Sequence, residues 1–274
     1  MNISAPVIKK CILIPLIALS ASMSSAALII YHEFETETAG VFTDTAGNYD
    51  GTGGQLDTVT TKIGSGSGSF GGDADQIDLG VTDSDLTGIS GFTLSTWIRP
   101  TSIASGRRYI FGNTEENKAS IMFMIDGSEL TLGLYSGGTW NGNPDNNNSP
   151  GAGIAANTWT HVALVWDGDY ATFYVDGATQ AGWTHNLADG TIDRQGNAPT
   201  PTAVIGANHV SGSSFLGNID DFAIWDEALT STQIEGLADE SLTPLTVIPE
   251  PSAIFLALGG LLTTLLFSRR RSCK

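Results

Sequence analysis

Side chains alternate with a period of two along much of the chain, most clearly from Trp159 to Gly177. Successive residues of a β-strand point to opposite faces, so this period indicates strands rather than helices. β-Branched and aromatic residues occupy both sets of alternate positions. Asp167-Gly168 divides the stretch and Asp176-Gly177 closes it, and Asp-Gly pairs favour tight hairpin turns because glycine tolerates a positive φ. We therefore predict a central hairpin that is covered on both faces.

Shorter runs of the same kind flank this hairpin, with turn-forming residues between them. We expect these further strands at Leu28–Phe34, Gln55–Ile63, Asp75–Gly80, Gly91–Pro100, Arg108–Asn113, Ala119–Ile125, Leu130–Tyr135, Ala203–Ala207 and Phe215–Trp225. Leu229–Ala238 predicts a short terminal helix with Thr230 or Ser231 as its N-cap. Short, closely spaced strands without interleaved helices indicate an all-β fold, a two-sheet antiparallel jelly-roll sandwich.

The first 26 residues have the organisation of a secretory signal peptide. Lys9 and Lys10 are followed by the apolar run Cys11–Met23, and Ser24–Ala26 offers small residues for cleavage. The apolar run is too short to span a bilayer as a helix, so we expect it to be removed.

Three features follow one another at the end of the chain, after a predicted linker at 241–248. They are the box Pro249, Glu250 and Pro251, an apolar run at 252–268, and the basic cluster Arg269, Arg270 and Arg271. A helix over the apolar run reaches about 25 Å, near the lower limit for a bilayer core of about 30 Å. The tail at 249–274 resembles the PEP-CTERM sorting signal of bacteria. This resemblance implies that an exosortase, a membrane enzyme, recognises the box and removes the transmembrane tail; a plain single-pass anchor is the alternative.

The net charge of −17 is unevenly distributed. Six of the twelve basic residues lie in the two end segments, which leaves the intervening domain strongly acidic. Such a surface repels phosphate backbones, so we expect no nucleic-acid partner. Both cysteines, Cys11 and Cys273, also lie in the end segments, and the domain must fold without a disulfide.

The longest stretch without a strand pattern is 136–157. It combines Trp140 with many Asn, Gly and Asp residues, including Asn143 and Asp145. Long loops in compact domains are often functional, and an aromatic face with neighbouring amides suits sugar recognition. We predict carbohydrate binding by these three residues; an insertion whose tryptophan caps the sheet edge is the alternative.

The strands also carry a family resemblance. The hairpin has the pattern W-x-H-V-A-x-V-x-D-G, and GFTLSTWIRP lies upstream of it and FLGNIDDFAIWDE downstream. Together these motifs resemble the laminin-G-like or concanavalin A-like jelly-roll domains, among them the pentraxins. We place this domain at 27–240. At His161 the resemblance implies a structural hydrogen bond within the sheet.

The resemblance further implies one structural calcium ion between the first and last strands. Glu33 and Asp221 are the expected ligands, with Asp75 as a weaker candidate. Pentraxins bind their ligands through two calcium ions, but the second site would fall at Ala207–His209, which has no carboxylate. We therefore do not expect the double-calcium site.

Some related domains are glucanases of the laminarinase type, which carry paired acids in a Glu-x-Asp-x-x-Glu or Glu-x-Asp-x-Glu pattern on one strand. No segment of this chain has either pattern. We predict that the protein is not an enzyme, but an exported cell-surface or matrix protein that binds extracellular polysaccharide or another surface partner. A purely structural matrix protein and, less favoured, a laminarinase-like glycoside hydrolase are the alternatives. Before processing, the protein would be held in the inner membrane.

Overall fold

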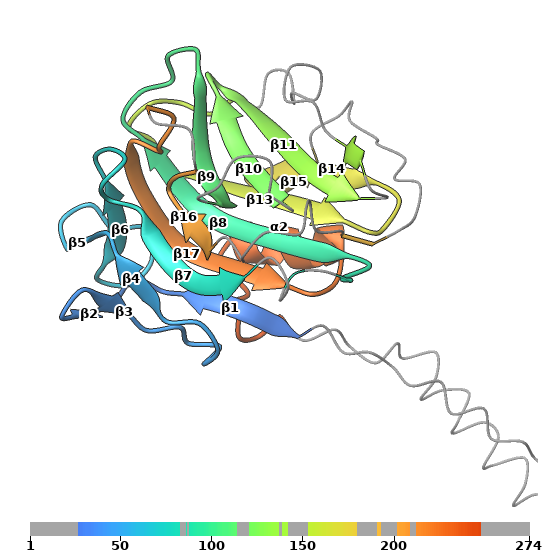
Figure 1. Cartoon of the computed structure of the whole chain (residues 1–274), viewed down its shortest axis with the longest axis horizontal. Helices are drawn as coiled ribbons and strands as arrows, with labels where there is room; N and C mark the ends of the chain where they lie inside the picture. The colour runs from blue at the N-terminus through green and yellow to red at the C-terminus, as the bar shows by residue number, and fades with distance from the viewer. Residues whose placement is uncertain are drawn as a thin grey trace, which may run out of the picture. The chain divides into compact units, whose positions relative to one another are not determined.

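The structure, a computed structural model, describes residues 27–82, 86, 88–113, 121–136, 139–141, 153–179, 191–192, 202–208 and 212–247. All of them belong to one compact unit, Ala26–Glu250. Its strands form two antiparallel sheets packed face to face (Figure 1). The prediction of an all-β, two-sheet antiparallel sandwich is confirmed.

Sheet A contains eight of the described strands. Seven lie in the order β15 (Ala178–Thr179), β14 (Ala171–Val175), β13 (Thr160–Trp166), β8 (Phe92–Pro100), β17 (Gly217–Trp225), β6 (Ser67–Phe70) and β5 (Gln55–Asp57). The eighth, β1 (Leu28–His32), pairs with β17. First and last strands of the domain are therefore neighbours.

Sheet B contains nine of the described strands. Their order is β12 (Thr139–Asn141), β11 (Glu129–Ser136), β10 (Ile121–Asp126), β9 (Arg107–Asn113), β16 (Thr202–Ile205), β7 (Ile77–Thr82), β4 (Gly51–Gly53), β3 (Val41–Phe42) and β2 (Glu37–Thr38). The chain crosses repeatedly between the sheets, as a jelly roll requires.

The predicted central hairpin is present as β13 and β14. Its turn brings Asp167 N to 3.0 Å from Tyr170 O, with Gly168 at a φ of 97°. The following turn holds Asp176 and Gly177 at φ values of 47° and 77°, as a type I′ turn requires. The Asp-Gly signals thus correctly located both turns.

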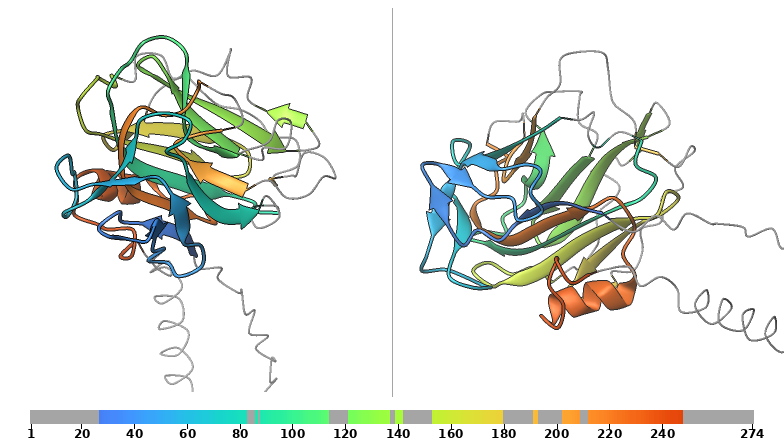
Figure 2. Two further views of the ribbon diagram at one scale, coloured as in Figure 1. Left: turned by 60° about the vertical axis from the view of Figure 1, so that its left-hand side comes forward. Right: turned by 90° about the horizontal axis from the view of Figure 1, so that it is seen from below.

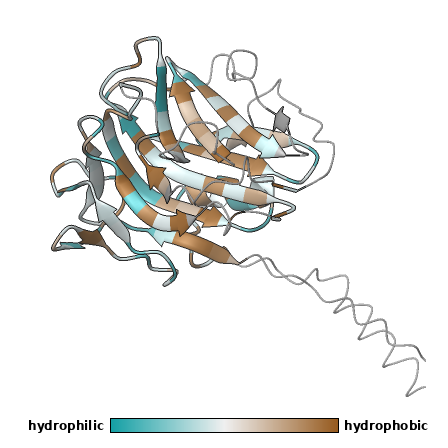
Figure 3. Cartoon of the chain, viewed as in Figure 1, coloured by the Kyte–Doolittle hydropathy of each residue, from teal (hydrophilic) through white to brown (hydrophobic). Residues whose placement is uncertain are grey.

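A hydrophobic core fills the space between the sheets, and apolar residues recur at alternate positions along the strands (Figure 3). Phe123 of sheet B stacks on Phe173 of sheet A, with ring centroids 6.1 Å apart. Phe111 and Phe222 make a second contact across the sheets at 5.7 Å. Large buried rings of this kind supply most of the apolar area that stabilises the sandwich.

Helix α2 (Ser231–Ala238) lies against the outer face of sheet A (Figure 2). A second, smaller core lies between this helix and the sheet. Thr230 and Gln233 form a capping box at the start of the helix, which confirms Thr230 as the N-cap. Segment 241–247, predicted as a linker, also packs here, with Val247 buried. The hairpin is therefore covered on both faces, as the apolar residues at both sets of positions predicted.

Strand β17 contains a bulge that shapes this outer face. Its pairing with β8 shifts between Asp220 and Ala223, and Asp221 takes a φ of 48°. The extra residue lets Asp220 face outward, opposite Trp97, while Phe222 enters the inter-sheet core. A bulge thus brings two consecutive carboxylates to the same region.

Three local predictions require correction. Strand β5 ends at Asp57 instead of Ile63, because the Asp57 carboxylate accepts hydrogen bonds from Val59 N and Thr60 N and turns the chain. Strand β1 ends at His32, before Phe34, whose φ is 55°. The stretch 136–157, predicted as a loop, includes β12.

Within the described part of the chain, no helix is long and apolar enough to cross a membrane. The predicted signal peptide at 1–26 and the predicted sorting tail at 249–274 lie outside the described residues. Both therefore remain predictions.

Candidate functional site

The outer face of sheet B carries a row of side chains across three neighbouring strands. Tyr109, Met124 and Thr131 lie opposite one another on β9, β10 and β11. Directly opposite residues of antiparallel strands share one face of the sheet. Their neighbours along β11, Leu130 and Leu132, belong to the inter-sheet core, so the row faces outward.

Polar groups are built into this row. The Thr131 hydroxyl is buried and has no hydrogen-bond partner among the described residues. Burial raises the pKa of Tyr109, although Arg107 and a hydrogen bond with Asn208 act in the opposite direction. Buried hydroxyl groups are normally paired, so Thr131 is an unsatisfied group of this row, but at 0% exposure it is not open to a ligand.

Asn208 packs on the same face of sheet B, directly over Gly112 of β9. A Cβ added to Gly112 would come within 3.0 Å of Asn208 Cβ. The Asn208 amide also donates to Met122 Sδ at 3.4 Å. The absence of a side chain at position 112 thus makes room for an amide beside Tyr109.

Of the three predicted sugar-binding residues, only Trp140 lies in the described part of the chain. Trp140 lies in β12, where it is paired with Tyr135 at the end of β11. Tyr135 is partly exposed and follows the outward positions of its strand. Asn143 and Asp145 lie outside the described residues. The sequence analysis did not identify Tyr109 and Tyr135 as candidate site residues. The alternation of each with core residues along its strand could have indicated that it lies on the outer face.

The predicted calcium ligands fall into two places. Burial, with smaller contributions from the charges of Glu33 and Glu35, raises the pKa of Asp221 to about 6, although the hydrogen bond from Tyr31 acts in the opposite direction. Asp75 lies in another loop, where its carboxylate accepts the Gly71 amide at 2.9 Å. Among the described residues, no group of three or more His, Cys, Asp or Glu could hold a metal ion. Glu33 and Asp221 alone would leave most of a calcium shell to backbone carbonyls and water.

His161 makes the structural contact that the resemblance implies. Its Nε2 lies 2.8 Å from Ser95 Oγ, on the outer face of sheet A. Burial, and more weakly the charge of Lys62, lower its pKa to about 3. Its imidazole is therefore neutral at ordinary pH and poorly suited to act as a general base.

Two antiparallel sheets packed face to face, with the first strand paired to the last, define the concanavalin A-like class of β-sandwich. The chain belongs to the concanavalin A-like lectin/glucanases superfamily, whose family model matches residues 70–235. It is 24% identical to the human neuronal pentraxin receptor over 175 residues, which cover 62% of this chain and 33% of the receptor. The chain thus spans about a third of that relative.

Solved structures share the fold at low identity. Domain 4 of AbnA, an extracellular arabinanase from Geobacillus stearothermophilus solved with arabinotriose, has a TM-score of 0.58 and 21% identity, covering 78% of this chain and all of that domain. A Trypanosoma rangeli sialidase has a TM-score of 0.54 and 14% identity over 80% of this chain and 34% of its own. The botulinum neurotoxin serotype D binding domain has a TM-score of 0.54 and 16% identity over 78% and 51%.

Proposed function

We propose that this protein is an exported, exosortase-processed surface or matrix protein whose jelly roll binds carbohydrate without catalysis. One observation carries the binding part of the proposal. The sandwich matches the whole of an arabinanase domain that was solved with a bound trisaccharide, and not just a fragment of it. Because one fold hosts many functions, the outer face of sheet B has to supply independent support.

The outer face of sheet B offers the groups that a sugar requires. Tyr135 supplies an aromatic ring next to the strand that carries Trp140. Asn208, which is 8% exposed, supplies an amide on the same face. Pyranose and furanose rings present apolar C–H faces to aromatic rings and hydroxyl groups to polar side chains. We therefore assign the sugar to this face, with Asn143 and Asp145 as further contacts.

The ends of the chain support export and processing. The basic and apolar segments of residues 1–26 suit secretion, and the order of box, apolar run and arginines at 249–274 suits an exosortase.

A calcium ion near Glu33 and Asp221 would offset the repulsion between their carboxylates and stabilise the contact of β1 with β17.

A purely structural matrix protein remains the second candidate, favoured by the strongly acidic domain. A laminarinase-like hydrolase is the third candidate function. An oligosaccharide-binding measurement together with a reducing-sugar assay separates all three.

The test uses the full-length chain in a mild detergent and a panel of oligosaccharides that includes arabinotriose and laminaritriose. We expect saturable binding of at least one oligosaccharide and no release of reducing ends. Trp140→Ala and Tyr135→Ala should each weaken binding about tenfold, since stacking on one aromatic ring contributes about 1–1.5 kcal/mol. Tyr170→Ala is the matched control, because Tyr170 is 45% exposed on a turn of sheet A. Binding that is equally weakened by all three substitutions, or absent throughout, would refute the assignment.

A further inference from the structure

A pocket of about 170 Å³ opens on the outer face of sheet A, away from the proposed sugar face. Its floor is formed by Trp97 and His161, which lie opposite each other on β8 and β13. Leu237 of α2 and Leu242 of the following segment form apolar walls, and Glu240 lies between them in the chain. The pocket therefore combines an aromatic ring, apolar walls and a carboxylate.

The floor contains an unused polar atom. His161 is 1% exposed, and its Nε2 is paired with Ser95 Oγ. Its Nδ1 is buried without a hydrogen-bond partner among the described residues. Buried ring nitrogens are normally paired, so this nitrogen is an unsatisfied polar atom of a residue that lines the pocket.

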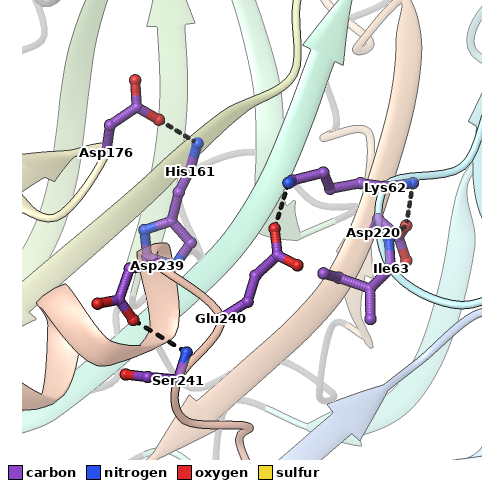
Figure 4. Close-up of polar contacts among 8 residues, drawn as sticks. All are labelled: Lys62, Ile63, His161, Asp176, Asp220, Asp239, Glu240 and Ser241. Carbon is purple, nitrogen blue, oxygen red and sulfur yellow. Dashed lines mark hydrogen bonds and ion pairs between the residues drawn. The ribbon is translucent and has the colours of Figure 1, made fainter.

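The ammonium group of Lys62 already contacts two of the residues that line the pocket. Lys62 Nζ lies 4.1 Å from the centroid of the Trp97 ring. The same ammonium group pairs with the Glu240 carboxylate (Figure 4). The backbone of Lys62 is held in place by its hydrogen bond to Asp220. Asp221, the second acidic residue of the lining, lies on the same bulge. The carboxylates around the pocket outnumber its cation.

We propose that this pocket binds a primary ammonium group carried on a short aliphatic stem, in exchange for the ammonium of Lys62. The face of Trp97 and the carboxylate of Glu240 recognise the charge, as aromatic rings and carboxylates recognise ammonium ligands elsewhere. Leu237 and Leu242 contact the stem. A free alkylamine and the side chain of a lysine present this same group.

Size supports the assignment. A cavity of about 150 Å³ in another protein accommodates benzene, so 170 Å³ is sufficient for a stem of about four carbons. A pyranose ring with its hydroxyl groups is larger and more polar than the apolar walls favour. The site is independent of the proposed sugar binding, because it lies on the opposite sheet and uses none of the same residues.

Trp97 provides a local probe of binding. The full-length chain labelled with 5-fluorotryptophan is followed by ¹⁹F NMR in mild detergent, with EGTA present and ionic strength held constant. The resonance that disappears in Trp97→Phe is assigned to Trp97. We expect n-butylammonium and Nα-acetyl-lysine methylamide to shift this resonance saturably, whereas n-butanol, butyrate and glucosamine leave it unchanged.

Three substitutions test the exchange. Lys62→Met removes the competing ammonium but keeps an unbranched stem, and should tighten butylammonium binding about five- to tenfold. Glu240→Gln should weaken binding by a similar factor. Glu235→Gln is the matched control: it makes the same charge change on exposed α2 surface and should bind as the unaltered chain does.

The proposal is wrong if butanol or glucosamine shifts the Trp97 resonance as butylammonium does. It is equally wrong if Lys62→Met leaves the dissociation constant unchanged, or if Glu235→Gln and Glu240→Gln weaken binding alike. The comparison of butylammonium with butanol on the unaltered chain requires no variant to fold. A failure at this pocket would leave oligosaccharide binding on sheet B unaffected, so the two proposals are tested separately.

Discussion

Replacing Asp220 with alanine should strongly destabilise the domain, because this carboxylate joins two segments that are far apart in the chain. Asp220 is fully buried on the outer face of sheet A. Its Oδ2 accepts Lys62 N at 2.9 Å and Ile63 N at 3.0 Å, and its Oδ1 accepts Asp221 N at 2.9 Å. One side chain thus ties the loop after β5 to the bulge in β17, 158 positions away.

The magnitude follows from the donors that lose their acceptor. Leaving a buried N–H without a partner costs about 1–3 kcal/mol. Two of the three donors lie in a loop and can recover part of this by reaching water. We therefore expect Asp220→Ala to lower the free energy of unfolding by about 3–4 kcal/mol, a large part of the 5–15 kcal/mol that is typical of a whole domain.

The loss should depend on pH in a defined direction. Burial raises the pKa of Asp220 to about 7, although the backbone donors act in the opposite direction. A carboxyl whose pKa is higher in the folded state contributes stability that is complete below about pH 4 and is lost as pH rises through 7. Asp220→Ala should therefore cost more at pH 5 than at pH 8. Comparing the two proteins at each pH cancels the effects of titrating groups that do not interact with Asp220; the neighbouring Asp221 does interact with it.

Urea unfolding of the full-length chain in mild detergent, followed by circular dichroism at pH 5 and pH 8, measures this difference. Asp169→Ala removes an exposed carboxylate from the β13–β14 turn and should change stability by less than about 0.5 kcal/mol. A loss below about 1 kcal/mol for Asp220→Ala, or a larger loss at pH 8 than at pH 5, would refute the reasoning.

The remaining predictions concern the core, a second carboxylate, calcium and the tail. Phe173→Ala should cost about 3–5 kcal/mol in urea unfolding, because the ring is buried and stacked across the two sheets; a loss below about 1 kcal/mol would contradict this packing of the inter-sheet core. With calcium removed by EGTA, Asp221→Asn should stabilise the domain by about 1–2 kcal/mol at pH 8 and hardly at all at pH 4, since the pKa of Asp221 is raised to about 6 and its contribution to stability is lost as pH rises through that value; equal effects at both pH values would argue against it. Calcium should raise the melting temperature relative to EGTA, and Glu33→Gln should abolish that increase; an unchanged increase would place the ion elsewhere. Changing both Pro249 and Pro251 to alanine should leave a C-terminal epitope tag attached in a host that contains an exosortase; removal of the tag at the normal rate would exclude recognition of the box.

Some features of the fold were decided by residues close together in the sequence. The Asp-Gly pairs located both turns around β14, because a positive φ is a local demand that glycine meets. Thr230 and Gln233 defined the start of α2, since the capping box closes within four residues. The alternation in β13 predicted burial on both faces, because each side chain's direction follows from the strand itself.

Other features depend on segments that are far apart in the chain. The loop after strand β5 is held against β17, because the amides of Lys62 and Ile63 donate to Asp220. Strand β12 exists because it pairs with β11, which no pattern within its three residues could show. Local patterns specify the direction of a side chain, but not the strand that will lie beside it.

The sequence by itself determined the strand periodicity, the turns, the helix cap and hence the two-layer antiparallel class of fold. Only the tertiary structure decided which residues meet: Tyr109 with Asn208 on one sheet, and Lys62 with Trp97 on the other. The physical reason is that these meetings arise from pairings between distant strands and from one bulge. The free energy of such pairings is a property of the assembled sheets and not of any single stretch.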